Sequence, residues 1–150
     1  MKIGISNDHA GTELKFEIKA YLESKGHTVV NYGTDSKESY DYPLAGKRIG
    51  LAVKNKEVDC GIAICGTGIG ISLAANKVKG IRAACVSEPV SAKLTKMHNN
   101  ANIICFGARI VGIETAKAIV DAWLETPFEN QQRHLRRIAM ISEIEEENQL

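Results

Sequence analysis

Residues 61–70 read Gly-Ile-Ala-Ile-Cys-Gly-Thr-Gly-Ile-Gly, an apolar run that ends in a cysteine and a glycine-rich loop. The apolar run predicts a buried strand of a parallel sheet, and residues 69–75 predict a helix that begins in the loop. The glycines permit a tight turn and close approach of the backbone. Cys65 is therefore expected at a strand end, beside backbone N–H groups and the positive end of a helix dipole. That setting binds anions and favours the thiolate form of a cysteine.

Strand and helix patterns alternate on both sides of this stretch. Strands are predicted over residues 2–6, 27–32, 59–65, 82–86 and 102–106, and helices over residues 12–25, 43–55, 69–75, 89–100, 113–124 and from about 130. The alternation predicts one α/β domain over residues 1–150. We expect a three-layer, Rossmann-like or flavodoxin-like fold, with a five-stranded parallel sheet in the order 2-1-3-4-5, helices on both faces and an added C-terminal helix.

Several polar residues follow the predicted strands. Asp8 and His9 come after the first strand, and Arg109 comes after the fifth. The carboxyl ends of parallel strands meet at one edge of the sheet, where ligands bind, so these residues are expected near Cys65. Asp8 also suits an N-cap of the next helix, but capping alone leaves the adjacent His9 unexplained.

Two further groups of polar residues lie at predicted helices. His98 and Asn99 close the fourth helix, where a C-cap is the alternative interpretation. Arg133 and Arg137 are four residues apart, so they share one helix face. Two guanidinium groups on one face suit a phosphate or a carboxylate; the alternative is a solvated basic turn paired with the acidic residues that follow.

The glycine-rich loop has two interpretations. A dinucleotide fingerprint requires the spacing G-x-G-x-x-G after the first strand, whereas this loop reads G-x-G-x-G after the third. A chain of 150 residues also leaves no room for a second, substrate-binding domain. The other interpretation is an oxyanion hole built from backbone N–H groups, and Cys65 immediately before the loop favours it.

Composition excludes several classes of function. A net charge of +1 argues against broad nucleic-acid binding. No apolar run is long enough to span a bilayer, and no secretory leader is apparent, so we expect a cytoplasmic protein without a membrane partner. The four cysteines form no C-x-x-C pair, which argues against a structural zinc site. Free buried thiols are expected, with Cys60, Cys85 and Cys105 as small core residues.

Taken together, the motifs of this chain resemble those of the type B ribose-5-phosphate isomerases, whose wider family includes allose-6-phosphate and galactose-6-phosphate isomerases. The resemblance runs along essentially the whole chain. The motifs that carry it include Asp8-His9-Ala10-Gly11, Asp41-Tyr42-Pro43, Cys65-Gly66-Thr67-Gly68-Ile69-Gly70, His98-Asn99, Phe106-Gly107-Ala108-Arg109 and Arg133-His134-x-x-Arg137.

The resemblance implies interconversion of D-ribose 5-phosphate and D-ribulose 5-phosphate, a step of the non-oxidative pentose phosphate pathway, through an enediolate and without a metal or cofactor. Cys65 would be the base, Thr67 would shuttle a proton between the substrate oxygens, and His98 would open the sugar ring near Asp8. The implied substrate-binding residues are His9, Tyr42, Gly66, Gly68, Ile69, Gly70, Asn99, Arg109, Arg133, His134 and Arg137.

The resemblance also implies a homodimer, or a tetramer of two dimers, in which two chains share each site. His98 and the helix of Arg133 and Arg137 would then serve from the chain opposite Cys65. Two other functions stay open at this point. One is isomerisation of a six-carbon sugar phosphate, such as allose 6-phosphate or galactose 6-phosphate, and the other is non-catalytic binding of a nucleotide or phosphate.

Overall fold

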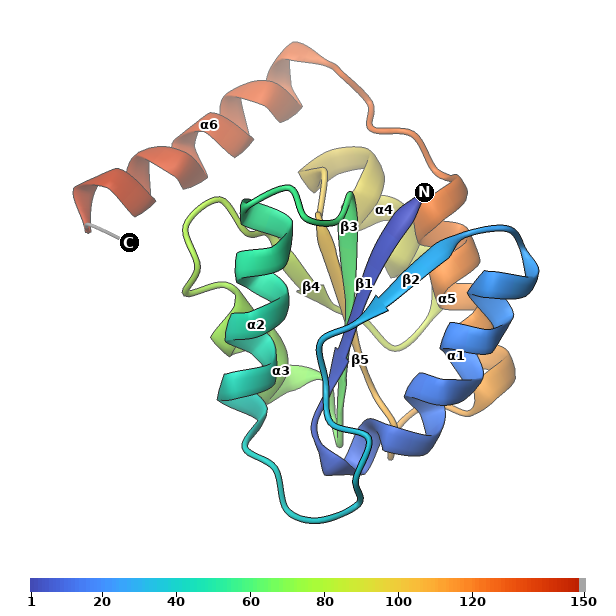
Figure 1. Ribbon diagram of the computed structural model, residues 1–150. Helices are drawn as coiled ribbons and strands as arrows, with labels where there is room; N and C mark the ends of the chain where they lie inside the picture. The colour runs from blue at the N-terminus through green and yellow to red at the C-terminus, as the bar shows by residue number, and fades with distance from the viewer. Residues whose placement is uncertain (149–150) are drawn as a thin grey trace.

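The computed structural model describes residues 1–148 as an α/β fold with helices on both faces of a parallel sheet (Figure 1). The strands are β1 Lys2–Asn7, β2 Thr28–Asn31, β3 Cys60–Cys65, β4 Ala83–Cys85 and β5 Ile103–Gly107. The helices are the 3-10 turn η1 His9–Gly11, α1 Thr12–Ser24, α2 Tyr42–Lys54, α3 Ile69–Ala75, α4 Pro89–Asn99, α5 Ile113–Glu125 and α6 Gln132–Glu147. The predicted fold class and the predicted elements are confirmed.

The strand order differs from the predicted one. The sheet runs β2-β1-β3-β5-β4, so β5 lies beside β3 and β4 lies at the edge. A central strand of a parallel sheet is covered on both faces and therefore needs a continuous apolar run. All five residues of β5 are buried, whereas the three residues of β4 are only partly buried or exposed. The expected order 2-1-3-4-5 is thus wrong because the more apolar strand occupies the interior place.

Two apolar layers flank the sheet, and side chains of β3 alternate between them. Ile62 and Ile64 belong to the layer under α1 and α5, which also contains Trp123. Ala63 and Cys65 belong to the layer under α2 and α3. This alternation, which is the period of any strand, directs the Cys65 side chain toward the α2–α3 side, where the residue is 4% exposed.

The cysteines are free thiols, and one of them departs from the prediction. Cys60 and Cys105 are buried as expected. Cys85 is exposed, because it is the last residue of the short edge strand β4. The prediction of Cys85 as a core residue is therefore wrong.

Helix α6 lies across the end of the sheet where β1 begins (Figure 1). His134 is the one buried residue of this helix. Near its C-terminal end, the Glu145 carboxylate accepts hydrogen bonds of 3.0–3.1 Å from the Gly80 N–H, and Glu146 pairs with Lys79. None of the helices within residues 1–148 combines the length and the apolar character that crossing a membrane requires.

Candidate active site

The loop after β3 holds Cys65 against the backbone. The Gly68 N–H donates to Cys65 Sγ at 3.1 Å. Gly68 has a φ of +79°, in the left-handed region, and a Cβ built there would lie 2.7 Å from backbone atoms of Phe106. Both the backbone conformation and the available space therefore require glycine at this position.

The end of β5 braces the same loop. The Ala108 N–H donates to the Cys65 carbonyl at 2.8 Å, and the Arg109 N–H donates to the Gly66 carbonyl at 3.0 Å. The Arg109 side chain lies over Gly66, where a Cβ would be 3.2 Å from Nη1. The structure thus places the predicted Arg109 guanidinium at the glycine-rich loop, beside exposed Thr67.

Asp8 and His9 lie beside β3, at the end of β1. The Asp8 N–H donates to the Ile64 carbonyl at 3.1 Å, next to Cys65. Asp8 Oδ1 accepts from the Ala10 N–H at 2.9 Å, so Asp8 also caps the turn that follows, as the alternative interpretation expected. Asp8 is 7% exposed, which leaves its carboxylate close to the site edge but largely shielded from water.

The loop between β2 and α2 and the first residue of α2 bring two tyrosines, Tyr40 and Tyr42, to this edge. The Tyr40 N–H donates to His9 Nδ1 at 3.0 Å. The same Nδ1 lies 3.3 Å from the Tyr40 carbonyl, so the Tyr40 backbone holds the Nδ1 side of the ring and Nε2 is the nitrogen without a partner within residues 1–148. The ring of Tyr42 covers Gly70, where a Cβ would lie 2.8 Å from the ring carbons. His9, Tyr42 and the glycine-rich loop therefore form one contiguous edge.

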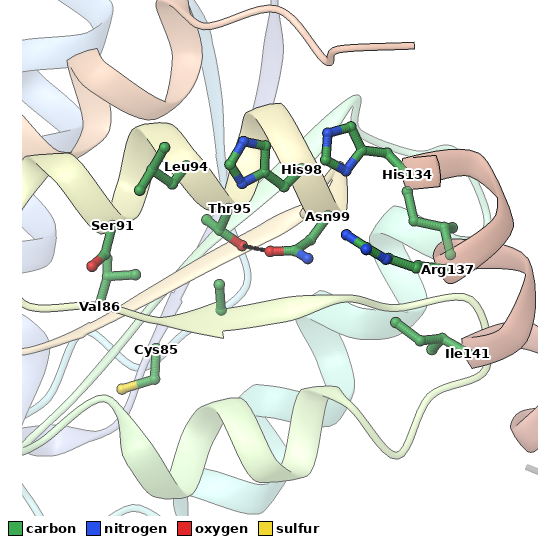
Figure 2. A pocket seen from close by; sticks show the side chains of 12 residues that line it. Cys85, Val86, Ser91, Leu94, Thr95, His98, Asn99, His134, Arg137 and Ile141 are labelled. Carbon is green, nitrogen blue, oxygen red and sulfur yellow. Dashed lines mark hydrogen bonds between the residues drawn. The ribbon is translucent and has the colours of Figure 1, made fainter. Parts of the chain in front are cut away.

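Four of the remaining predicted residues line a separate groove of about 490 Å³ between β4, α4 and α6 (Figure 2). His98 and Asn99 enter it from the last turn of α4, and His134 and Arg137 enter it from α6. Arg133 is exposed and lies outside the lining. Thr95 Oγ1 donates to Asn99 Oδ1 at 3.2 Å, which leaves the Asn99 amide N–H₂ toward the groove.

The rings of His98 and His134 stack face to face, with centroids 4.8 Å apart and planes inclined by 13°. His134 is 4% exposed, and its Nε2 lies 3.5 Å from a carboxylate oxygen of Glu129. Burial lowers the pKa of the His134 imidazole, and the nearby positive charge of Arg133 acts in the same direction. The groove therefore contains an imidazole whose surroundings favour its neutral form, against the His98 ring and with a guanidinium nearby.

His98, Glu129 and His134 also have ligand-type atoms within 4.8 Å of one another. A histidine nitrogen binds a metal ion in the plane of its ring, at about 2.0–2.1 Å. Two rings stacked at 13° do not direct their nitrogens at one point. The trio in this arrangement is a stack backed by a carboxylate and not a formed metal centre.

Within one chain the two groups of predicted residues lie at opposite edges of the sheet. Cys65 ends β3 at the carboxyl edge, whereas α4 runs back from the end of β4 to the start of β5 and so carries His98 to the amino edge. The contribution of two chains to each site stays a prediction.

The sequence did not predict two residues that hold other site residues in position, Glu129 and Lys15. Glu129 backs His134, and Lys15 is fully buried while its ammonium group holds the loop that carries Tyr40. A single glutamate before a helix carries no recognisable spacing. A lysine on an amphipathic helix is ordinarily solvated, so no sequence signal marked Lys15 for burial.

Comparison with known proteins places these residues in a family context. The chain matches the ribose/galactose isomerase family over residues 3–141. Ribose-5-phosphate isomerase B of Escherichia coli strain K12 is 51% identical over 145 residues, which are 97% of this chain and 97% of that protein.

Solved structures agree. Ribose-5-phosphate isomerase B of Clostridium thermocellum has a TM-score of 0.97 and 49% identity, covering 99% of each chain. Ribose-5-phosphate isomerase B of Mycoplasma genitalium, described as having bound ribulose 5-phosphate, has a TM-score of 0.92 and 41% identity, covering 97% of each chain.

Proposed function

This chain belongs to the ribose/galactose isomerase family, and on that premise we propose that it interconverts D-ribose 5-phosphate and D-ribulose 5-phosphate. The observation that carries the proposal is Cys65 at the carboxyl end of β3, bound by the Gly68 N–H at 3.1 Å. A basic sulfur beside a loop of backbone donors has the parts that proton abstraction next to a carbonyl needs.

The Cys65 thiolate takes the proton from C2 of the open-chain aldose and returns it to C1. The electron pair of the broken C–H bond moves onto the carbonyl oxygen and forms an enediolate. Backbone N–H groups of residues 66–70 stabilise that negative charge, each worth about 3 kcal/mol. Thr67 then moves a proton between the two oxygens, which completes the ketose.

Ribose 5-phosphate is mainly a closed ring, so the ring must open first. We assign this step to His98, which donates a proton to the ring oxygen while Asp8 accepts one from the C1 hydroxyl. Tyr42 and Asn99 orient the sugar. His9 Nε2, Arg109, Arg133 and Arg137 bind the phosphate, and this remote binding fixes the position of the reacting carbons.

These assignments require two chains in each site, because His98 and Cys65 lie at opposite edges of one chain. We propose a homodimer in which α6 of one protomer covers the glycine-rich loop of its partner. Exposed apolar side chains on both surfaces support this pairing, among them Ile69 at 55% and Leu73 at 61% on α3, and Ile144 at 56% on α6. Two such dimers can pair further into a tetramer. A cytoplasmic location is consistent with four free thiols.

The test is exchange of the C2 hydrogen of ribose 5-phosphate with solvent, followed together with turnover. Cys65→Ala is expected to abolish both while the variant still folds and binds the sugar phosphate. Cys60→Ala, at the other end of the same strand, is the matched control and is expected to keep both. Retained exchange in Cys65→Ala would show that another group is the base. Tight dinucleotide binding without exchange would favour the non-catalytic alternative.

The same assay decides the substrate. Turnover is compared between ribose 5-phosphate, allose 6-phosphate and galactose 6-phosphate. We expect a higher kcat/KM on the five-carbon substrate. A higher kcat/KM on either six-carbon substrate would change the assigned substrate but not the assigned base, Cys65.

A further inference from the structure

We propose that His134 is a positioning residue that fixes the ring of His98 by stacking, and that Glu129 holds His134 in place. The inference builds on the proposed role of His98 in ring opening. It assigns to His134 a role other than the direct substrate contact that the family resemblance implied.

The stack is the contact that orients the His98 ring. The two ring centroids are 4.8 Å apart and the planes are inclined by 13° (Figure 2). Within residues 1–148 the His98 ring nitrogens accept or donate no hydrogen bond, although the ring is only partly exposed. A side chain with two free torsions samples several rotamers unless a neighbour restricts it. The flat face of His134 supplies that restriction by covering one face of the His98 ring.

The short segment before α6 fixes His134 in turn. The Glu129 N–H donates to the carbonyl of Met97, the residue before His98, at 3.0 Å. The Glu129 carboxylate then lies 3.5 Å from His134 Nε2, a close contact rather than a formed hydrogen bond, and the His134 N–H donates to the Gln131 carbonyl at 3.0 Å. One residue thus anchors the segment to the last turn of α4 and also faces the stacked ring.

Burial explains why His134 suits this role. At 4% exposure it has little contact with solvent, so it is poorly placed to bind a diffusing phosphate directly. Burial also lowers the pKa of its imidazole, with Arg133 and His98 adding to the effect and Glu129 opposing it. An uncharged ring can lie against His98 before and after His98 transfers a proton, whereas two charged rings would repel each other.

The experiment compares His134→Leu, which removes the flat face, with His134→Phe, which keeps it. Gln132→Leu, exposed on the same helix, is the matched control. Two activities are measured on the intact oligomer: turnover of ribose 5-phosphate, which needs ring opening, and solvent exchange at C1 of ribulose 5-phosphate. Ribulose 5-phosphate is acyclic because its 5-oxygen is esterified, so its exchange needs only the enediolate step.

We expect His134→Leu to lower kcat on ribose 5-phosphate at least about tenfold with little change in KM. We expect exchange on ribulose 5-phosphate to stay within about threefold of the parent, and His134→Phe to recover most of the lost turnover. Glu129→Gln keeps the backbone bond to Met97 and should give an intermediate loss. The His98 Hε1 resonance should also move in His134→Leu, because the ring current of the stacked neighbour is removed.

Three results would overturn the proposal. A rise in KM with unchanged kcat in both His134 variants would mean direct substrate binding. A proportional fall of turnover and exchange would mean a general structural role, and unchanged turnover in His134→Leu would mean no role. His98→Ala separates this inference from the proposed function. If His98→Ala keeps full turnover, the assignment of ring opening to His98 is wrong. If His98→Ala loses turnover while His134→Leu keeps it, only the positioning role of His134 is wrong.

Discussion

Gly68 and Gly80 share a backbone conformation but differ in their surroundings. Their φ angles are +79° and +84°, both in the region that side chains other than glycine adopt at a cost. A Cβ on Gly68 would lie 2.7 Å from backbone atoms of Phe106, whereas one on Gly80 would meet nothing within 4 Å. Alanine substitutions at the two glycines therefore separate the free-energy cost of a left-handed backbone from the cost of a steric clash with β5.

Gly80→Ala should lower the free energy of unfolding by about 1–2 kcal/mol and leave kcat nearly unchanged, because only the conformation is strained. Gly68→Ala should cost more and should also inactivate the enzyme, because the loop must move away from β5 and take the donor of Cys65 Sγ with it. Urea denaturation and turnover of ribose 5-phosphate measure the two effects. Equal stability losses and equal activity in the two variants would contradict this account.

The residues of this loop could be predicted from the sequence because the information is local. Cys65 and the glycines follow an apolar run at fixed spacing, and that spacing already implies a strand end and an anion-binding turn. Glu129 and Lys15 could not be found in this way. Their roles arise from contacts with Met97 and Thr34, which lie far away in the sequence.

At the scale of the element, three side chains fasten the loop between β2 and α2. Asn7 Nδ2 donates to the Thr34 carbonyl at 3.0 Å, and Thr12 Oγ1 donates to the Ser36 carbonyl at 2.8 Å. The fully buried Lys15 donates from Nζ to the Thr34 carbonyl at 2.6 Å. The loop leads to Tyr40 and to the start of α2, so its anchoring sets the position of the tyrosine edge of the site.

Lys15→Met removes the ammonium group from both the Thr34 carbonyl and the Asp35 carboxylate. It should therefore lower the free energy of unfolding by about 1–3 kcal/mol, the usual effect of losing charged hydrogen bonds from a buried position. It should also raise KM and speed amide hydrogen exchange over residues 33–41. Lys19→Met is the matched control on the same helix. Its i,i+4 pair with Glu23 is partly exposed, so its loss should cost no more than about 0.5 kcal/mol. Unchanged loop exchange in Lys15→Met would refute the anchoring role.

The elements themselves were largely readable from local patterns, but their order in the sheet was not. Pro43 and Pro89 sit in the first turns of α2 and α4, and Asn100 takes the left-handed conformation that ends α4. The choice between β4 and β5 for the central place depends on which strand buries more apolar surface in the folded sheet. That comparison is non-local, and both strands carry short apolar runs in the sequence.

At the scale of the whole molecule, buried thiols link stability to alkaline pH. Burial raises the pKa of Cys60 to about 12 and that of Cys105 well above its usual value. Unfolded thiols lose their protons near pH 9.0 while the folded ones keep theirs. The unfolded state then binds fewer protons, so stability is fully present below pH 9.0 and falls as pH rises toward about 12.

Each of these thiols should therefore remove about 1.4 kcal/mol of stability per pH unit above the unfolded pKa. Urea denaturation at pH 8 and pH 10 measures the loss in the parent and in the double variant Cys60→Ala, Cys105→Ala. The double variant is expected to be less stable at pH 8 but to lose less between the two pH values. An identical loss in both proteins would show that other groups cause the alkaline dependence.

The division of the site between two edges of the sheet leads to a test on mixed dimers. Cys65→Ala and Arg137→Ala should each be nearly inactive alone. In a heterodimer of the two, one site carries both substitutions, but the other combines the intact Cys65 of one protomer with the intact Arg137 of its partner. Random mixing makes half of the dimers mixed, each with one working site of two, so refolding the variants together should restore about a quarter of the parent activity. Native mass spectrometry verifies that heterodimers have formed. If a mixture rich in heterodimers stays inactive, Cys65 and Arg137 of the same protomer form one site. In a single chain these two residues could meet only if α6 left its position beside α4.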